Sequence, residues 1–228
     1  MERRRYQDIQ IRLEGIGYRI KDKWLFRDVN LTFEDSESYL LLGRNGSGKT
    51  TLLKILAGIE MPSEGRIYLN GKIVHERDEL LSVSGYVFQN PQTQVIGSTV
   101  EEDVAFGLEN LNIERDEMIK RVENILKRIG LWEVREYDPS LLSGGQLQRL
   151  AIASVMALDP HILLLDEPLS MLDPQGSEEV LEMIRSVAKD KTVVVATHEP
   201  ERYPFVREKL VIKDKRIFKI DDFSKIIL

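Results

Sequence analysis

The chain contains one glycine-rich motif that fits the pattern G-x-x-x-x-G-K-[ST] at every defined position. It reads Gly43-Arg44-Asn45-Gly46-Ser47-Gly48-Lys49-Thr50 and is followed by Thr51. Glycines let successive backbone N–H groups turn toward phosphate oxygens, and a helix that begins near Lys49 adds the positive end of its dipole. Lys49 would place its charge on the β- and γ-phosphates, and the Thr50 hydroxyl would ligate Mg²⁺. An ordinary glycine turn is the alternative, but the flanking strand and helix patterns favour a nucleotide phosphate site.

A second candidate is a pair of adjacent carboxylates at the end of the apolar run Ile162–Leu165. Successive residues of a strand point to opposite sides, so Asp166 and Glu167 would have different roles if the strand geometry continued there. Asp166 fits a ligand that holds Mg²⁺, partly through water, and Glu167 fits a general base or water-orienting group beside a γ-phosphate. Two solvated acids at a strand end are the alternative, which the phosphate-binding motif in the same chain makes the weaker interpretation.

A third motif precedes a predicted helix that runs from Leu147 to Ala157. It reads Leu142-Ser143-Gly144-Gly145-Gln146. Backbone N–H groups of two glycines at a helix start form a site for an anion, and Ser143 adds a hydroxyl donor. A turn with this composition is unspecific by itself. With the glycine-rich loop upstream and the Asp-Glu strand downstream, the chain resembles the ATP-binding cassette (ABC) ATPases over nearly its whole length.

This resemblance implies roles for further residues. Gln89, after Tyr86-Val87-Phe88, is similar to the glutamine that contacts Mg²⁺ and the attacking water, and His198 is similar to the switch histidine that contacts the γ-phosphate. Ser170 and Asp173 resemble the D-loop, although Met171 stands where the family more often has a small residue. Tyr18 resembles the aromatic residue that stacks on adenine, with Trp24 and Phe26 nearby.

The resemblance also implies a site that two chains build together. In the family two cassettes pack head to tail, so that Ser143 and Gly145 of one chain would meet the γ-phosphate held by Lys49 of the other. ATP would then be buried in the interface, and hydrolysis would release the dimer by replacing one shared phosphate with two anionic products.

The pattern of apolar residues indicates an α/β fold that can position these groups. Apolar and polar residues alternate at Ile9–Leu13 and Val29–Phe33, which indicates strands with one face exposed to solvent. Continuous apolar runs, typical of buried parallel strands, occur at Tyr39–Leu42, Ile162–Leu165 and Thr192–Ala196. Asn70-Gly71 is a hairpin signal.

We expect a P-loop NTPase core with a mainly parallel sheet and an N-terminal antiparallel β subdomain, formed by residues 1–88 and 158–228. The segment 89–157 is predicted to be an inserted helical subdomain that carries the signature motif, with Ile119, Val122, Ile125, Leu126 and Ile129 on one helical face.

Composition limits the classes of function. The chain has 228 residues, 32 Lys and Arg against 38 Asp and Glu, and a net charge of −6, which disfavours a nucleic-acid binder that neutralises phosphates. The absence of cysteine excludes disulfides, thiol catalysis and Cys-ligated zinc. Residues 1–8 lack the apolar stretch of a secretory signal, and no segment has the length of a membrane-spanning helix.

Among ABC proteins, the sequence favours the ATPase subunit of a transporter. Chromosome-type ATPases insert a long coiled coil between the P-loop and the signature, and translation factors carry two cassettes; neither feature is present. The segment Val87–Pro91 with Gln94 and Ser98–Gly107 is similar to the ATPase subunits of energy-coupling factor (ECF) transporters, which take up vitamins and cobalt or nickel ions. Gln92 and Thr93 depart from an acidic pair common there.

That resemblance implies Mg²⁺ as cofactor and a second ABC ATPase subunit as partner, identical or different. It also implies a transmembrane coupling subunit, a separate substrate-binding membrane protein, and a peripheral location on the cytoplasmic face of the membrane. Another ABC importer or exporter, or an ABC ATPase acting on DNA, remains the alternative.

Overall fold

The computed structural model describes residues 8–220, which form two compact units. We call the first the sheet unit; it comprises residues 8–86, His161–Glu167 and 187–220. The second, the helical unit, comprises Val87–Pro160 and Pro168–Ser186. Most of the segment considered above as a possible secretory signal, residues 1–7, lies outside the described residues. The segment Pro168–Ser186 belongs to the helical unit, whereas the sequence analysis assigned it to the core.

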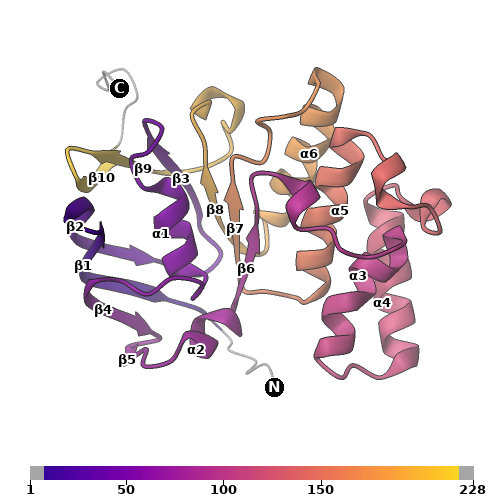
Figure 1. Cartoon of the computed structure of the whole chain (residues 1–228), viewed down its shortest axis with the longest axis horizontal. Coiled ribbons are helices and arrows are strands. Elements are labelled where there is room, and N and C mark those ends of the chain that lie inside the picture. Colours follow the sequence, from indigo (N-terminus) through magenta and orange to yellow (C-terminus); the bar gives the residue numbers. More distant parts are fainter. Residues whose placement is uncertain (1–7, 221–228) are drawn as a thin grey trace. The chain divides into compact units, whose positions relative to one another are not determined.

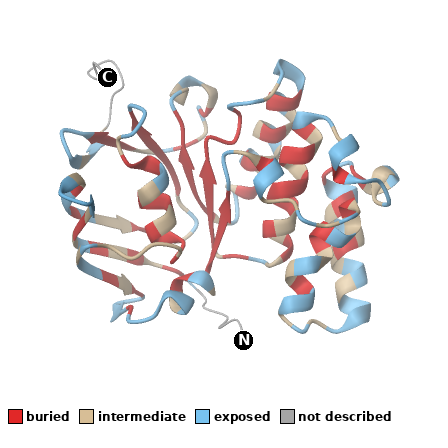
Figure 2. Ribbon diagram, viewed as in Figure 1, coloured by how far each residue is buried: buried red, intermediate tan, exposed pale blue. Residues whose placement is uncertain are grey.

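A six-stranded sheet forms the centre of the sheet unit, with strand order β10-β9-β3-β8-β7-β6 (Figure 1). Strand β3 runs parallel to both β8 and β9, and β7 runs parallel to β8, as the continuous apolar runs predicted. Every residue of β3, β7 and β8 is buried (Figure 2). The strands are β3 (Ser38–Gly43), β6 (Ser84–Val87), β7 (Ile162–Asp166), β8 (Thr192–Ala196), β9 (Glu208–Lys213) and β10 (Arg216–Ile220).

The N-terminal residues form the expected antiparallel sheet, in the order β2-β1-β4-β5. Its strands are β1 (Ile11–Ile20), β2 (Lys23–Phe33), β4 (Glu64–Leu69) and β5 (Lys72–Ile73). The Asn70-Gly71 turn joins β4 to β5 as predicted, with positive φ angles of 49° and 76° at the two turn residues. Alternation along β1 buries Ile11 and Leu13 on one face, as the period of two requires.

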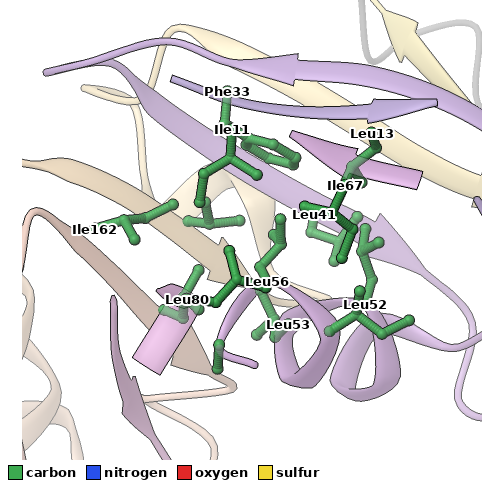
Figure 3. Close-up of a cluster of buried hydrophobic side chains, with 14 of the residues drawn as sticks. Ile11, Leu13, Phe33, Leu41, Leu52, Leu53, Leu56, Ile67, Leu80 and Ile162 are labelled. Carbon is green, nitrogen blue, oxygen red and sulfur yellow. The ribbon is translucent and has the colours of Figure 1, made fainter. Parts of the chain in front are cut away.

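One hydrophobic core joins both sheets of this unit to helix α1 (Lys49–Leu56) (Figure 3). Leu52, Leu53 and Leu56 project from the helix toward Ile11, Leu13 and Phe33 of the antiparallel sheet and Leu41 and Ile162 of the central sheet. Full burial of such a side chain contributes about 1.5–3 kcal/mol. The helix that starts at the P-loop is therefore fixed by its apolar face, and its first turn cannot shift without disturbing this core. The short helix α2 (Arg77–Leu81) adds Leu80.

The helical unit packs its helices around a second core. Its helices are α3 (Val100–Asn110), α4 (Arg115–Arg128), α5 (Gly144–Ala157) and α6 (Pro174–Val187), with 3₁₀ turns at Pro91–Thr93, Trp132–Val134 and Pro139–Leu141. Val104, Leu126 and Leu150 are fully buried in this core, and Met183 of α6 packs against it. Through Met183, α6 belongs with the helical unit although a strand of the sheet unit precedes it in the chain.

The predicted stripe on α4 is only partly a core face. Val122, Leu126 and Ile129 are buried, Ile125 is half-buried, and the Ile119 side chain is half exposed at 50%. Ile119 lies about one turn nearer the start of α4 than Val122. Ile119 therefore lies at the exposed end of the predicted helical face and not in the core.

The described chain contains no helix with the length and apolar character needed to cross a membrane.

Candidate functional site

The P-loop connects the end of β3 to the start of α1. Gly48 has φ 107° and Gly46 has φ 77°, a region that residues with a side chain rarely adopt. A Cβ atom added to Gly48 would also lie 2.9 Å from the Phe26 ring, a core residue at 0% exposure. The helix begins at Lys49, as expected, and the backbone N–H of Leu52 donates to the carbonyl of Gly48 at 2.9 Å.

Lys49 points back over this loop. Its side chain is only 8% exposed, and its ammonium group donates to the carbonyl oxygen of Gly43 at 2.9 Å. The same nitrogen lies 3.3 Å from Oε1 of Glu167. A buried ammonium group with two oxygen partners on one side retains a further N–H for a phosphate oxygen.

Glu167 leaves the strand that carries Asp166. Strand β7 ends at Asp166, and Glu167 has a positive φ of 48°, while its backbone N–H donates to the carbonyl of Ala196 at 2.9 Å. The strand geometry assumed in the sequence analysis thus stops one residue before Glu167. It is this left-handed residue, rather than strand alternation, that gives the two carboxylates different surroundings.

His198 completes the group around Glu167. Its Nδ1 atom lies 2.9 Å from Oε2 of Glu167, so the carboxylate is held between a histidine and Lys49. The Glu167 side chain is 9% exposed, and that of His198 is 56% exposed. His198 follows β8 by two positions and Glu167 follows β7 by one, so the parallel pairing of these strands brings the two side chains together.

Asp166 is oriented by a tyrosine that the sequence analysis did not identify as a site residue. The Tyr86 hydroxyl donates to Oδ2 of Asp166 at 3.0 Å, and both residues are buried. Burial and the negative charge of Asp166 raise the pKa of Tyr86 well above its ordinary value, so the hydroxyl keeps its proton and donates. Tyr86 comes from β6, and only the sheet order that places β6 beside β7 reveals the pair.

The other oxygen of Asp166 fits a metal-bound water or a metal ion. Oδ1 is buried and has no hydrogen-bond partner among the described residues. An orphaned carboxylate oxygen is costly to bury unless a donor or a cation meets it. Mg²⁺ that arrives with a nucleotide needs one or two protein oxygens, because phosphates and water supply the rest. The Thr50 hydroxyl at the first turn of α1 is the second candidate ligand.

A cavity of about 670 Å³ opens beside the P-loop, within the sheet unit. Its walls are formed by Trp24 and Leu25 of β2, the P-loop residues 44–47, and the residues 212–215 at the turn between β9 and β10. Tyr18 does not line this cavity. The Tyr18 hydroxyl donates to Oε2 of Glu60 at 3.2 Å, and its ring centroid lies 6.4 Å from that of Phe26. Trp24 is thus the aromatic residue that lines the cavity. It lies six positions after Tyr18, the residue that the family resemblance indicated for stacking on adenine.

The signature motif forms the start of α5 in the helical unit. Ser143 is the N-cap residue, and its hydroxyl accepts from the backbone N–H of Gln146 at 3.3 Å, while the Gln146 side chain accepts from the N–H of Ser143 at 3.0 Å. The helix starts at Gly144, three residues earlier than predicted, because this reciprocal capping extends it. A Cβ atom on Gly145 would lie 2.7 Å from Cα of Gly176, so α5 and α6 approach too closely for a larger residue.

The remaining predicted residues of the helical unit lie in connections. Gln89 is exposed directly after β6, and Ser170 is exposed in the loop before α6. Oδ1 of Asp173 accepts from the backbone N–H of Gly176 at 2.6 Å and caps the start of α6. Met171, which departs from the family pattern, has 65% of its surface exposed, so its size meets no obstacle within the chain.

Comparison with known proteins gives a consistent result. Residues 26–170 match the model of the family described as ABC transporter. The energy-coupling factor transporter ATP-binding protein EcfA1 of Thermotoga maritima is 46% identical over 85% of this chain and 74% of its own. The protein of the same name from Listeria innocua is 41% identical over 91% of this chain and 76% of its own.

A solved structure agrees with the fold. That of cbiO1 from Clostridium perfringens, described as part of the ABC transporter complex cbiONQ, matches with a TM-score of 0.85 and 32% identity over 94% of this chain and 89% of the other. The predicted fold class, an ABC ATPase with an antiparallel N-terminal sheet and a largely parallel core, is confirmed. The family match, the identities and the shared fold together show that the chain belongs to the ABC transporter family, as one of the ATP-binding proteins of the energy-coupling factor type.

Proposed function

We propose that the chain hydrolyses ATP to ADP and phosphate and thereby drives solute uptake through a membrane transporter. The observation that carries the proposal is the position of Glu167, whose carboxylate is held by Lys49 at 3.3 Å and by His198 at 2.9 Å. A buried base beside a phosphate-binding lysine is the arrangement that activates water against a γ-phosphate.

In the proposed reaction, the P-loop N–H groups and Lys49 hold the β- and γ-phosphates. Glu167 takes a proton from water as the water oxygen bonds to the γ-phosphorus, and the bond from that phosphorus to the β,γ-bridging oxygen breaks to leave ADP. His198 orients Glu167 and the γ-phosphate. Thr50, Asp166 and Gln89 would hold Mg²⁺, which neutralises phosphate charge when bound.

The signature motif would act on a second subunit. Ser143 and the N–H groups of Gly144 and Gly145 lie at the start of the 14-residue helix α5, where backbone donors and the helix dipole favour an anion. In a head-to-tail dimer this helix start would meet the γ-phosphate bound to the partner subunit's P-loop, with Gln146 holding the cap and the Ser170–Asp173 segment contacting the partner.

The transported solute would be a vitamin or a cobalt or nickel ion, and the chain would lie on the cytoplasmic face of the membrane. The partners would be a transmembrane coupling subunit and a separate substrate-binding membrane protein. The family resemblance implies these solutes, partners and location, and it is supported by relatives named as energy-coupling factor transporter proteins and by a structural neighbour described as part of an ABC transporter complex. The helical unit offers exposed apolar side chains for docking, among them Phe88 at 38% and Ile96 at 63%.

Co-purification in mild detergent tests this assignment. Phe88→Ala and Gln92→Ala should weaken the complex with the membrane subunits and uncouple hydrolysis from transport, while ATP binding to the isolated chain stays nearly intact. The matched control is Phe218→Ala, which removes a phenyl group of comparable exposure (47%) from the sheet unit. ATPase activity that is stimulated by duplex DNA, falls with salt and occurs without a recoverable membrane partner would overturn the transporter function in favour of a DNA-acting ATPase.

A further inference from the structure

The turn between β9 and β10 lies in the wall of the cavity beside the P-loop. Lys213 pairs with Arg216 across the hairpin, which leaves Asp214 and Lys215 as a two-residue turn. The turn is anchored from outside, because the backbone N–H of Arg27 in β2 donates to the carbonyl of Lys215 at 2.9 Å. A β-hairpin turn fixed at both ends presents its side chains in a constant position relative to the P-loop.

The second residue of this turn is unusual for its backbone. Asp214 has φ 49° and Lys215 has φ 62°, so both are left-handed, as in a type I′ turn. Asn-Gly or Asp-Gly is the favoured pair at these positions, and a lysine in the left-handed region is strained. Strain that is kept at the wall of a binding cavity points toward a role for the turn that carries it.

The chemistry of the cavity wall divides into three parts. Residues 44–47 of the P-loop supply backbone donors for phosphates, and Trp24, Leu25 and Ile212 supply apolar surface for a base. Among the residues lining the cavity, Asp214 is the acidic one; it lies between Lys213 and Lys215, which also line the cavity, and its side chain is exposed. An ionised carboxylate only accepts hydrogen bonds and repels phosphate, so the ligand group beside it must be a donor.

We propose that Asp214 accepts hydrogen bonds from the ribose hydroxyls of the bound nucleotide and thereby makes the β9–β10 turn a determinant of nucleotide selectivity. The sugar joins the phosphates to the base, and its two vicinal hydroxyls offer two donors to the two oxygens of one carboxylate. The apolar part of the wall suits the base, whereas the exposed turn suits the polar sugar. The inference rests on the proposed binding of ATP at the P-loop.

The test compares ligands with and without a ribose hydroxyl. MgATP, its 2′-deoxy analogue and inorganic tripolyphosphate are titrated against the wild-type chain, Asp214→Gly and Lys215→Gly. Asp214→Gly removes the carboxylate and fits the positive φ, while Lys215→Gly relieves the strain at the same turn and keeps the carboxylate. Asp214→Asn, which also tolerates this backbone, is the second variant if the glycine variant folds poorly.

We expect Asp214→Gly to bind MgATP about threefold to tenfold more weakly, the loss typical of a hydrogen bond to a charged group that is partly exposed to water. Its affinity for tripolyphosphate should stay equal or rise, since a negative charge near the phosphates is removed. The preference of the wild-type chain for MgATP over the 2′-deoxy analogue should disappear in Asp214→Gly and persist in Lys215→Gly.

Two results would overturn the proposal. If Asp214→Gly strengthens the binding of all three ligands equally, the carboxylate only repels phosphate. If the preference for the ribose hydroxyl is unchanged, the turn does not contact the sugar.

In both cases the wild-type chain still binds MgATP and tripolyphosphate, so the proposed ATPase function is unaffected. A wild-type chain that binds neither ligand would refute the two proposals together. The ratio of MgATP to MgGTP affinity shows whether Asp214 contacts the 6-amino group of the base and not the ribose. We expect Asp214→Gly to leave this ratio unchanged.

Discussion

The ammonium group of Lys49 lies 3.3 Å from the carboxylate of Glu167, and more than nine tenths of each side chain is buried. The lysine of the phosphate-binding loop and the carboxylate proposed as the base are therefore one ion pair. Pairing with an opposite charge offsets part of the cost of burying each side chain. Substitution of either residue consequently leaves the other buried charge without its partner. A variant in which both charges are removed therefore separates the effect on nucleotide binding from the effect on stability.

Lys49→Ala should reduce MgATP affinity by more than about tenfold, because the point charge on the β- and γ-phosphates is lost. It should also lower the free energy of unfolding by about 3–5 kcal/mol, the cost of leaving one buried charge without its partner. Titration with nucleotide and chemical denaturation measure the two quantities. The double variant Lys49→Ala/Glu167→Gln should regain part of the stability and none of the affinity. Unchanged MgATP affinity in Lys49→Ala would refute the P-loop assignment.

Glu167→Gln should bind MgATP at least as well as the wild-type chain and lose turnover. The amide keeps the shape of the side chain but cannot accept the proton of the attacking water. We expect an ATP-dependent dimer that persists during size-exclusion chromatography. The control is Glu182→Gln, which changes an exposed carboxylate on α6 that lies 3.5 Å from the guanidinium of Arg185. Hydrolysis at the normal rate by Glu167→Gln would show that another group is the base.

A site completed by a second chain predicts that specific ATPase activity rises with protein concentration until the dimer is saturated. Mixing Lys49→Ala with Ser143→Arg protein should restore part of the activity if the two form mixed dimers, since some sites then combine an intact P-loop with an intact signature. Ser143→Arg also removes an N-cap, which costs about 1 kcal/mol, so its stability must be measured separately. Constant specific activity down to very dilute protein would indicate a site complete within one chain or a dimer too tight to dissociate.

Tyr86→Phe should raise the Mg²⁺ concentration needed for half-maximal nucleotide binding by about threefold to tenfold. The hydroxyl that orients Asp166 is lost, while the ring still fills its place in the sheet. Because burial and Asp166 raise the pKa of Tyr86, the hydroxyl is protonated throughout the neutral and mildly alkaline range, and the difference between variant and wild type should not depend on pH there. Nucleotide binding in the presence of excess EDTA serves as the control, since it should be the same for both proteins.

Trp24 should report nucleotide binding through its fluorescence. The chain has two tryptophans, and Trp132 lies in the helical unit between Lys127 and Arg135. In a Trp132→Phe variant, MgATP should change the emission of Trp24 because the base contacts its ring, whereas tripolyphosphate should change it much less. A comparison of Trp24→Ala with Tyr18→Ala then identifies which ring supports the base. If only Tyr18→Ala weakens MgATP binding, the prediction from the family resemblance holds and the base lies outside the cavity.

The sequence by itself determined the local parts of the site. A buried apolar run, a glycine loop and a helix are consecutive in the chain, so the P-loop and Lys49 could be located without knowledge of the fold. The same holds for the Ser143-Gly144-Gly145 motif ahead of a helix and for Asp166 at the end of an apolar run, because both are patterns of residues adjacent in the sequence.

Tertiary structure decided everything that depends on which strands become neighbours. The order of β6, β7 and β8 brings Tyr86 to Asp166 and His198 to Glu167, and the place of β9 beside β3 brings Asp214 to the wall of the P-loop cavity. It also decided that Trp24 rather than Tyr18 faces this cavity. Pairing between distant strands is selected by the packing of the whole core, and no pattern within one segment of sequence records which partner that packing will choose.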